Sequence, residues 1–350
     1  MKRVGLALDI DGVFLRGSTV LDFAARTIKL IQGKNTPFIF ITNGGGTTER
    51  EKAQQLSEKL DTEIHTSQIL LSHSPYREHV DTYHRSRVLV VGSEKCLEVA
   101  KEYGFEKAVS VEDIHREIED IYPWRRPLLQ KLPSTATSSS HEPISAAFVF
   151  HDPTDWAVEM QILTDCILGG SPIGSGMKQR IPLFACNPDL TFKTTFHRPR
   201  YTQGAFLEAF STLFRKYTGE YPNINMCGKP FPVQYRYAED MIRKEAERMS
   251  NSVTPDLFIG IGDNPEADIK GANLAGQHWR SVLVKTGIHE SNENDRDNPA
   301  DLFCNDAEEA MQILYESSSD SSAGAVDLFM SNDDLMSVIS KEDGLRESKR

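Results

Sequence analysis

Four short segments carry the side chains that could do chemistry. The first is Asp9-Ile10-Asp11-Gly12, which follows an apolar run and sets two carboxylates two residues apart. On an extended strand these carboxylates point to one side, and Gly12 lets the chain turn away tightly behind them. Two like charges so close need a cation or a shared proton. Taken alone, the pattern is equally typical of a capping or turn pair of aspartates.

The second and third segments could bind an anion. Phe38-Ile39-Phe40-Ile41 is followed by Thr42-Asn43-Gly44-Gly45-Gly46, so an apolar run ends in a hydroxyl, an amide and three glycines. Side-chain and backbone donors of this kind suit a phosphate oxyanion. Lys229, between Gly228 and Pro230, can place one positive charge on a phosphoryl group. An ordinary glycine-rich turn and a solvated lysine are the alternatives.

The fourth segment is the most specific. An apolar run, Leu257 to Ile261, ends in Gly262-Asp263-Asn264-Pro265-Glu266-Ala267-Asp268. Asp263 at the strand end and Asp268 in a first helical turn begun by Pro265 can converge on a hard divalent cation. Oxygen ligands with no nearby His or Cys favour magnesium over zinc. The alternative is a helix N-terminus that merely carries acids.

The elements that must position these segments alternate along the chain. Short β-like runs are followed by helical stretches, which predicts a parallel sheet wrapped by helices. The expected strands of this sheet are 6–10, 38–41, 257–261 and 282–284. The expected helices are 21–31, 48–60, 203–217, 233–250 and 307–316. The carboxyl ends of such strands are where open α/β sheets bind their ligands.

A second α/β unit is expected between the second and third segments. Its strands are 88–91, 146–150 and 181–186, and its helices are 94–103 and 156–168. We therefore expect residues 1–84 and 190–316 to form a core, and residues 85–189 to form an inserted cap. Residues 317–350 are rich in Ser and Asp and poor in aromatics, which predicts a disordered acidic tail.

Composition excludes several classes of protein. The 350 residues carry 39 Lys and Arg against 51 Asp and Glu, a net charge of -12, which argues against nucleic acid or an anionic membrane as partner. No apolar run approaches the roughly 18 residues that span a bilayer, so no membrane span is expected. The 5 cysteines are scattered singly, which suits a reducing compartment and a role as small core residues. Only three residues precede the apolar run that begins at Val4, so no presequence is visible and an intracellular protein is expected.

The order of the four segments, an Asp pair, a Thr, a Lys and a second Asp pair, resembles the motifs of the haloacid dehalogenase superfamily. The long insertion between Thr42 and Lys229, with Asn187-Pro188-Asp189 as its return to the core, resembles subfamily IIA, the p-nitrophenylphosphatase-like and pyridoxal-phosphatase-like enzymes. The resemblance covers about residues 4–315. It implies an α/β fold: a Rossmann-like, doubly wound parallel-sheet core with an α/β cap inserted between motifs II and III.

The resemblance also implies roles for the residues. Asp9 would be the nucleophile that forms an aspartyl-phosphate, and Asp11 the general acid and then the general base. Thr42, Asn43 and Lys229 would bind the phosphate. Mg2+ would be bound by the carboxylates of Asp9 and Asp263 and by the backbone carbonyl of Asp11, and Asp268 would complete the shell, directly or through water. Dehalogenases of this superfamily typically lack an acid at the position of Asp11, because a halide leaves without a proton, so a phosphatase is favoured.

The sequence thus predicts a magnesium-dependent phosphatase, a phosphoric monoester hydrolase acting on a small phosphorylated metabolite. A catalytically weak binding or regulatory protein and a phosphotransferase remain as alternatives. Asn187, Asp189 and Arg200 are expected to contact substrate or cap. Family resemblance favours a mitochondrial location, with the cytoplasm as the alternative, and a homodimer through the cap.

Overall fold

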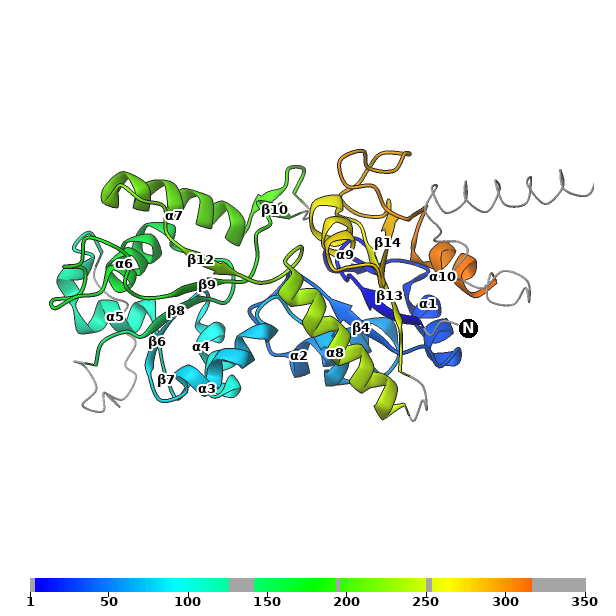
Figure 1. The fold of residues 1–350 in the computed structure, drawn as a ribbon, viewed down its shortest axis with the longest axis horizontal. Helices are drawn as coiled ribbons and strands as arrows, with labels where there is room; N and C mark the ends of the chain where they lie inside the picture. The colour runs from blue at the N-terminus through cyan, green and yellow to red at the C-terminus, as the bar shows by residue number, and fades with distance from the viewer. Residues whose placement is uncertain (1–3, 126–141, 193–195, 250–253, 317–350) are drawn as a thin grey trace, which may run out of the picture. The chain divides into compact units, whose positions relative to one another are not determined.

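The computed structural model describes residues 4–125, 142–192, 196–249 and 254–316 (Figure 1). The expected acidic tail, 317–350, lies outside the described residues. The chain divides into two compact units. The first unit comprises Met1–Phe40, Leu56–Gln68 and Ala238–Arg350, and the second comprises Ile41–Gln55 and Ile69–Tyr237.

A six-stranded sheet has the order β15-β14-β13-β1-β4-β5. Its strands are, in chain order, β1 (Val4–Leu8), β4 (Phe38–Ile41), β5 (Ile69–Leu70), β13 (Leu257–Gly262), β14 (Trp279–Val284) and β15 (Leu302–Cys304). β1 lies in the interior of the sheet and pairs in parallel with β13 on one side and β4 on the other. Because both of its faces are covered, β13 is buried along its whole length. The sheet confirms the predicted Rossmann-like α/β core.

Helices accompany the strands of this sheet, as the alternating pattern predicts. They are α1 (Ala24–Gly33), α2 (Glu49–Leu60), α8 (Pro232–Arg248), η4 (Pro265–Ile269), α9 (Lys270–Leu274) and α10 (Ala307–Glu316). A small hairpin, β2 (Leu15–Arg16) and β3 (Thr19–Val20), follows the first aspartate pair. Within the described residues, no helix is both long enough and apolar enough to cross a membrane.

The second unit contains a five-stranded parallel sheet of order β12-β9-β8-β6-β7. Its strands are β6 (Arg87–Val91), β7 (Lys107–Ser110), β8 (Ala146–Val149), β9 (Leu183–Ala185) and β12 (Ile224–Met226). The sheet therefore continues beyond residue 189, the expected end of the cap. The sequence did not predict this strand at Ile224–Met226, and the boundary at residue 189 stays a prediction.

Helices pack on both faces of this sheet (Figure 1). One apolar cluster joins the strands to α5 (Val111–Glu117), α6 (Trp156–Leu168) and α7 (Gln203–Thr218). A second cluster joins them to α4 (Glu94–Tyr103) and to the segment formed by η2 (Ser74–His79) and α3 (Val80–Tyr83). Helices α4, α6 and α10 begin and end at the residues that the sequence predicts. All five cysteines are free and buried, which confirms them as core residues.

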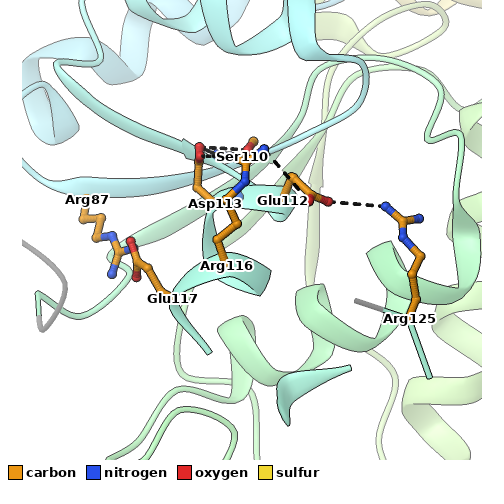
Figure 2. Close-up of polar contacts among 7 residues, drawn as sticks. All are labelled: Arg87, Ser110, Glu112, Asp113, Arg116, Glu117 and Arg125. Carbon is orange, nitrogen blue, oxygen red and sulfur yellow. Dashed lines mark hydrogen bonds and ion pairs between the residues drawn. The ribbon is translucent and has the colours of Figure 1, made fainter. Parts of the chain in front are cut away.

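The sequence did not predict helix α5 or strand β7. Figure 2 shows the polar contacts at the two ends of α5. Ser110 ends β7 and caps α5: its hydroxyl accepts from the backbone N–H of Asp113, whose carboxylate accepts from the N–H of Ser110. At the other end of the helix, Arg87 donates to both oxygens of Glu117 at 2.6 and 2.5 Å. Arg125 donates to Glu112 at 3.3 Å. Short apolar periods bounded by such caps are hard to distinguish from loop.

One carboxyl group of the second unit is buried at the start of α6. Glu159 is 5% exposed, and one of its oxygens accepts from the backbone N–H of Asp155 at 2.8 Å. Burial raises the pKa of Glu159 to about 7, although this hydrogen bond favours the charged form. Arg125, whose charge acts to lower the pKa of Glu159, contacts Asp155 directly. Glu159 therefore holds a proton in the folded chain at a pH where the unfolded chain has released it.

Glu159 should make the wild type less stable as the pH rises. We predict that Glu159→Gln removes this loss of stability. Between about pH 4.5 and pH 7 the folded chain binds more protons here than the unfolded chain, so the free energy of unfolding decreases as the pH rises through this window. Glutamine keeps the acceptor without the charge, and the variant should exceed the wild type at pH 8 by up to roughly 3 kcal/mol. Urea denaturation at pH 5 and pH 8 measures this. Glu98→Gln, at an exposed position of α4, is the control; equal pH slopes for wild type and Glu159→Gln would refute the prediction.

Candidate active site

Asp9 and Asp263 lie at the same edge of the six-stranded sheet because their strands are parallel neighbours. Leu8 pairs with Ile261, and the N–H of Asp9 donates to the carbonyl of Ile261 at 2.9 Å. Asp9 directly follows Leu8, and Asp263 follows Gly262, the last residue of β13. Their side chains are buried, with 5% of Asp9 and 3% of Asp263 exposed. The first and fourth segments thus meet at one edge of the sheet.

Asp268 reaches the same place from the turn of helix that follows β13. Pro265 begins this turn, and the Asn264 side chain caps it by accepting from the N–H of Glu266 at 3.0 Å. The carboxylate of Asp268 in turn accepts from the N–H of Asn264 at 3.0 Å. Asp9, Asp263 and Asp268 each offer one oxygen, and these oxygens lie within 4.8 Å of one another. All three side chains are buried.

Three glycines make room for these carboxylates. A Cβ on Gly12 would lie 2.3 Å from Oδ2 of Asp263, and one on Gly287 would lie 1.8 Å from the same oxygen. A Cβ on Gly262 would lie 2.1 Å from Cγ of Asp268. Gly12 also has a φ of 90°, a conformation that other residues rarely adopt. The backbone comes so close to the carboxylates that no side chain fits between them.

A loop that the sequence did not single out fixes Asp263. The N–H of Ile288 donates to Oδ2 of Asp263 at 2.6 Å, and the Thr286 hydroxyl donates to the carbonyl of Gly12 at 2.5 Å. This loop follows β14, which pairs in parallel with β13. The sequence could therefore have placed the loop beside Asp263. A Thr-Gly pair after an apolar strand is the signal that could have found it.

The donor set fits a hard divalent cation. Two oxygens bound to one Mg2+ at 2.0 to 2.1 Å lie at most about 4.2 Å apart, so small movements of the three carboxylates would bring them into range. Burying three carboxylates close together without a compensating positive charge would be costly. Asp11 is exposed, and its carboxylate is not one of the three.

The predicted phosphate-binding residues form a cluster in the second unit. Asn43 and Lys229 are tied by two hydrogen bonds: the N–H of Lys229 donates to Oδ1 of Asn43 at 2.7 Å, and Nδ2 of Asn43 donates to the carbonyl of Lys229 at 2.9 Å. Nζ of Lys229 donates to the carbonyl of Ile41 at 3.3 Å. Thr42 accepts from the N–H of Gly44 at 2.9 Å. Thr42, Asn43 and Lys229 are all buried.

The Asn187-Pro188-Asp189 segment joins this cluster. Asp189 accepts from Nδ2 of Asn43 at 3.1 Å, while Asn187 accepts from the N–H of Asp189 and so shapes the turn. Gln203 at the start of α7 accepts from the N–H of Asn187 at 2.9 Å. Arg200 is exposed on β11 (Arg200–Tyr201), and its guanidinium lies 4.5 Å from the centre of the Phe196 ring.

Comparison with known proteins agrees with this geometry. A haloacid dehalogenase-like hydrolase model matches residues 6–106, and a HAD-hydrolase-like model matches residues 226–310. A mitochondrial hydrolase of Saccharomyces cerevisiae is 31% identical over 346 residues, covering 90% of this chain and 96% of that protein. A Schizosaccharomyces pombe fusion of cardiolipin synthase (CMP-forming) with a mitochondrial hydrolase is 32% identical over 288 residues. That match covers 80% of this chain and 47% of the fusion protein.

Solved structures share the fold over most of the chain. The p-nitrophenyl phosphatase of Archaeoglobus fulgidus superposes with a TM-score of 0.62 at 18% identity, covering 90% of this chain and 100% of that one. The glycerol phosphate phosphatase of Mycobacterium tuberculosis, solved in complex with magnesium, has a TM-score of 0.59 at 20% identity and covers 87% of this chain and 75% of that one. Family models on both halves of the core and a full-length relative above 30% identity show that the chain belongs to the haloacid dehalogenase-like hydrolases.

Proposed function

We propose that this hydrolase is a magnesium-dependent phosphatase that transfers the phosphoryl group of a small metabolite to Asp9 and then to water. The observation that carries the proposal is the buried cluster of Asp9, Asp263 and Asp268, whose oxygens lie within 4.8 Å of one another. A phosphoryl transfer site needs positive charge beside its nucleophile, and an oxygen-only cluster is what binds Mg2+. Bound there, the cation would neutralise charge on the transferring oxygens.

The residues of this chain account for both steps of the reaction. A carboxylate oxygen of Asp9 attacks phosphorus, and the bond to the leaving alkoxide breaks as the new bond forms. Asp11 donates its proton to that alkoxide and afterwards accepts a proton from the attacking water. Phosphate then leaves, and Asp9 is again a carboxylate. Asp11 is exposed, which supports a group that exchanges protons with substrate and water.

Thr42, Asn43 and Lys229 are proposed to bind the phosphoryl oxygens. Their mutual contacts, described above, support their action as one cluster, and Lys229 supplies the positive charge. Asn187 and Asp189 are proposed to support this cluster from the turn before α7. Arg200 is proposed to contact the substrate outside the transferring group.

Phosphate esters of glycerol are the first substrates to test. One structural neighbour is a glycerol phosphate phosphatase, and one relative is a fusion of a cardiolipin synthase with a mitochondrial hydrolase. The S. cerevisiae relative is a mitochondrial hydrolase, so we propose a mitochondrial location, with the cytoplasm as the alternative. A homodimer through the cap completes the proposal.

Asp9→Asn should abolish turnover. Removing the nucleophile should lower kcat by at least about 10⁴-fold on every substrate, because no other group can form the covalent intermediate. Phosphate release from glycerol phosphates, p-nitrophenyl phosphate and a wider panel of phosphorylated metabolites, each with Mg2+, measures this.

Chelation by EDTA should stop the wild type, and added Mg2+ should restore it. A wild type that releases no more phosphate than Asp9→Asn supports a binding or regulatory protein instead, and transfer to an added alcohol supports a phosphotransferase.

Asp11→Asn should discriminate between leaving groups. General acid catalysis contributes about 10² to 10⁴-fold, and an alkoxide needs that proton far more than p-nitrophenolate does. Where transfer to Asp9 limits the rate, kcat/KM should fall more for glycerol phosphate than for p-nitrophenyl phosphate. An equal loss on both substrates would argue that Asp11 is not the acid.

Gly287→Ala should damage the carboxylate cluster without unfolding the chain. The added methyl would overlap Oδ2 of Asp263 and displace it, and misplacement by about 1 Å can cost about 10²-fold in rate. The apparent affinity for Mg2+ should fall as well, as titration of activity with Mg2+ would show. Gly33→Ala, where a Cβ meets nothing within 4 Å, is the matched control and should keep full activity. Wild-type activity in Gly287→Ala would contradict the assigned role of Asp263.

A further inference from the structure

His73 is a buried histidine that the mechanism above does not use. Its side chain is 0% exposed. Nδ1 lies 2.8 Å from the hydroxyl of Tyr103, and that hydroxyl donates to Oε1 of Glu49 at 2.6 Å. Tyr103 and Glu49 are both 7% exposed. A buried chain of polar groups therefore runs from Glu49 through Tyr103 to His73, entirely within the second unit.

Glu49 is held as a carboxylate. Its oxygens accept from the hydroxyl of Ser74 at 2.7 Å and from Nη2 of Arg77 at 3.0 Å, and the Arg77 guanidinium lies 3.8 Å from the centre of the Tyr103 ring. Burial alone would raise the pKa of Glu49, but the hydrogen bonds from Tyr103, Arg77 and Ser74 lower it. Burial and the neighbouring carboxylate raise the pKa of Tyr103.

The charge on Glu49 fixes the direction of the chain of hydrogen bonds. The Tyr103 hydroxyl has one proton and donates it to Glu49. The Tyr103 oxygen must therefore accept a hydrogen bond from Nδ1–H of His73. Burial lowers the pKa of His73 to about 4; His151 and Arg77 act in the same direction, whereas Glu49 and a backbone contact at Thr47 act against it. The imidazole is therefore neutral, and Nε2 carries a lone pair. In the described part of the chain, Nε2 of His73 is one of four buried side-chain atoms without a hydrogen-bond partner.

The ring lies against the glycine loop that follows Thr42. A Cβ on Gly45 would lie 2.8 Å from Cδ2 of His73, the carbon bonded to Nε2, and 3.1 Å from Oγ of Ser72. Ser72 donates to the carbonyl of Gly44 from its N–H at 3.3 Å and from its hydroxyl at 3.4 Å. The unpaired Nε2 is thus buried at the edge of the ring that the loop covers. An acceptor left unpaired there has a cost that only a hydrogen bond from the loop or from water would remove.

We propose that His73 is a positioning residue for the Gly44–Gly46 loop, with Nδ1 fixed by Tyr103 and Glu49 and Nε2 accepting a hydrogen bond from the loop when it binds an anion. The proposal rests on the phosphatase function above, because Thr42 and Asn43 lead into this loop. His73 touches no substrate. It acts by fixing the backbone whose donors receive the phosphoryl oxygens.

Two substitutions separate positioning from packing. His73→Gln places an amide near the position of Nε2, whereas His73→Asn places one near Nδ1 and leaves the loop side without an acceptor. Both lose the ring, so similar melting temperatures are expected. We expect His73→Gln to keep kcat within about threefold and His73→Asn to lose about tenfold, with KM changed less. Equal kcat values for the two variants would overturn the proposal.

Two measurements need no turnover. Long-range ¹H–¹⁵N spectra of the wild type should show the Nδ1–H tautomer of His73 from pH 5.5 to pH 8, and an Nε2–H tautomer would overturn the proposal. Amide hydrogen exchange at residues 44–47, with Mg2+ and inorganic phosphate, should be faster in His73→Asn than in His73→Gln and the wild type. Tyr103→Phe keeps the ring under Arg77 but removes the hydroxyl, so His73 should no longer be held in the Nδ1–H tautomer. An unchanged tautomer would contradict the fixing role of Tyr103. If the wild type has no phosphatase activity, the proposed function fails while these spectra and exchange rates still decide the role of His73.

Discussion

The parallel pairing of β1 with β13 is the constraint on which the rest of the site depends. It brings Asp9 and Asp263, far apart in the sequence, to one edge of the sheet, with the N–H of Asp9 bonded to the carbonyl of Ile261 at 2.9 Å. A slip of one residue would turn every side chain of a strand to the opposite face. Apart from Val4, which is half-buried, every residue of the two strands is buried, so such a slip would force the close-packed side chains on both faces to repack. The core that stabilises the fold therefore also sets the register of the nucleophile.

Close packing of backbone and carboxylates follows from that register. Gly12, Gly262 and Gly287 stand where any Cβ would collide with Asp263 or Asp268, and the N–H groups of Ile288 and Asn264 hold these two carboxylates in place. Gathering buried negative charge opposes folding, and the hydrogen bonds offset part of that cost. A bound cation would offset more of it. The arrangement is typical of a site whose geometry is set before the ligand arrives.

The sequence predicted the features that depend on local patterns of residues. The apolar strands, the helices α4, α6 and α10 and the α/β class follow from periodicity, and the resemblance to the haloacid dehalogenase superfamily implied that Asp9 lies with Asp263 and Asp268. Contacts between distant segments could not be read in this way. The bond from Ile288 to Asp263, the tie between Asn43 and Lys229, and the chain from Glu49 to His73 depend on which loops the sheet edges bring together. The strand at Ile224–Met226 joins the five-stranded sheet for the same reason, because its three residues carry no signal of their partner.

The covalent intermediate on Asp9 is the central claim, and chemical trapping tests it most directly. Enzyme turning over a phosphate ester with Mg2+ is quenched and reduced with borohydride, which converts an aspartyl-phosphate to homoserine, and the Asp9 peptide is then examined by mass spectrometry. The account predicts homoserine at Asp9, dependent on both substrate and Mg2+, with Asp11, Asp263 and Asp268 unmodified. Phosphate release without modification of Asp9, or modification at another aspartate, would contradict it.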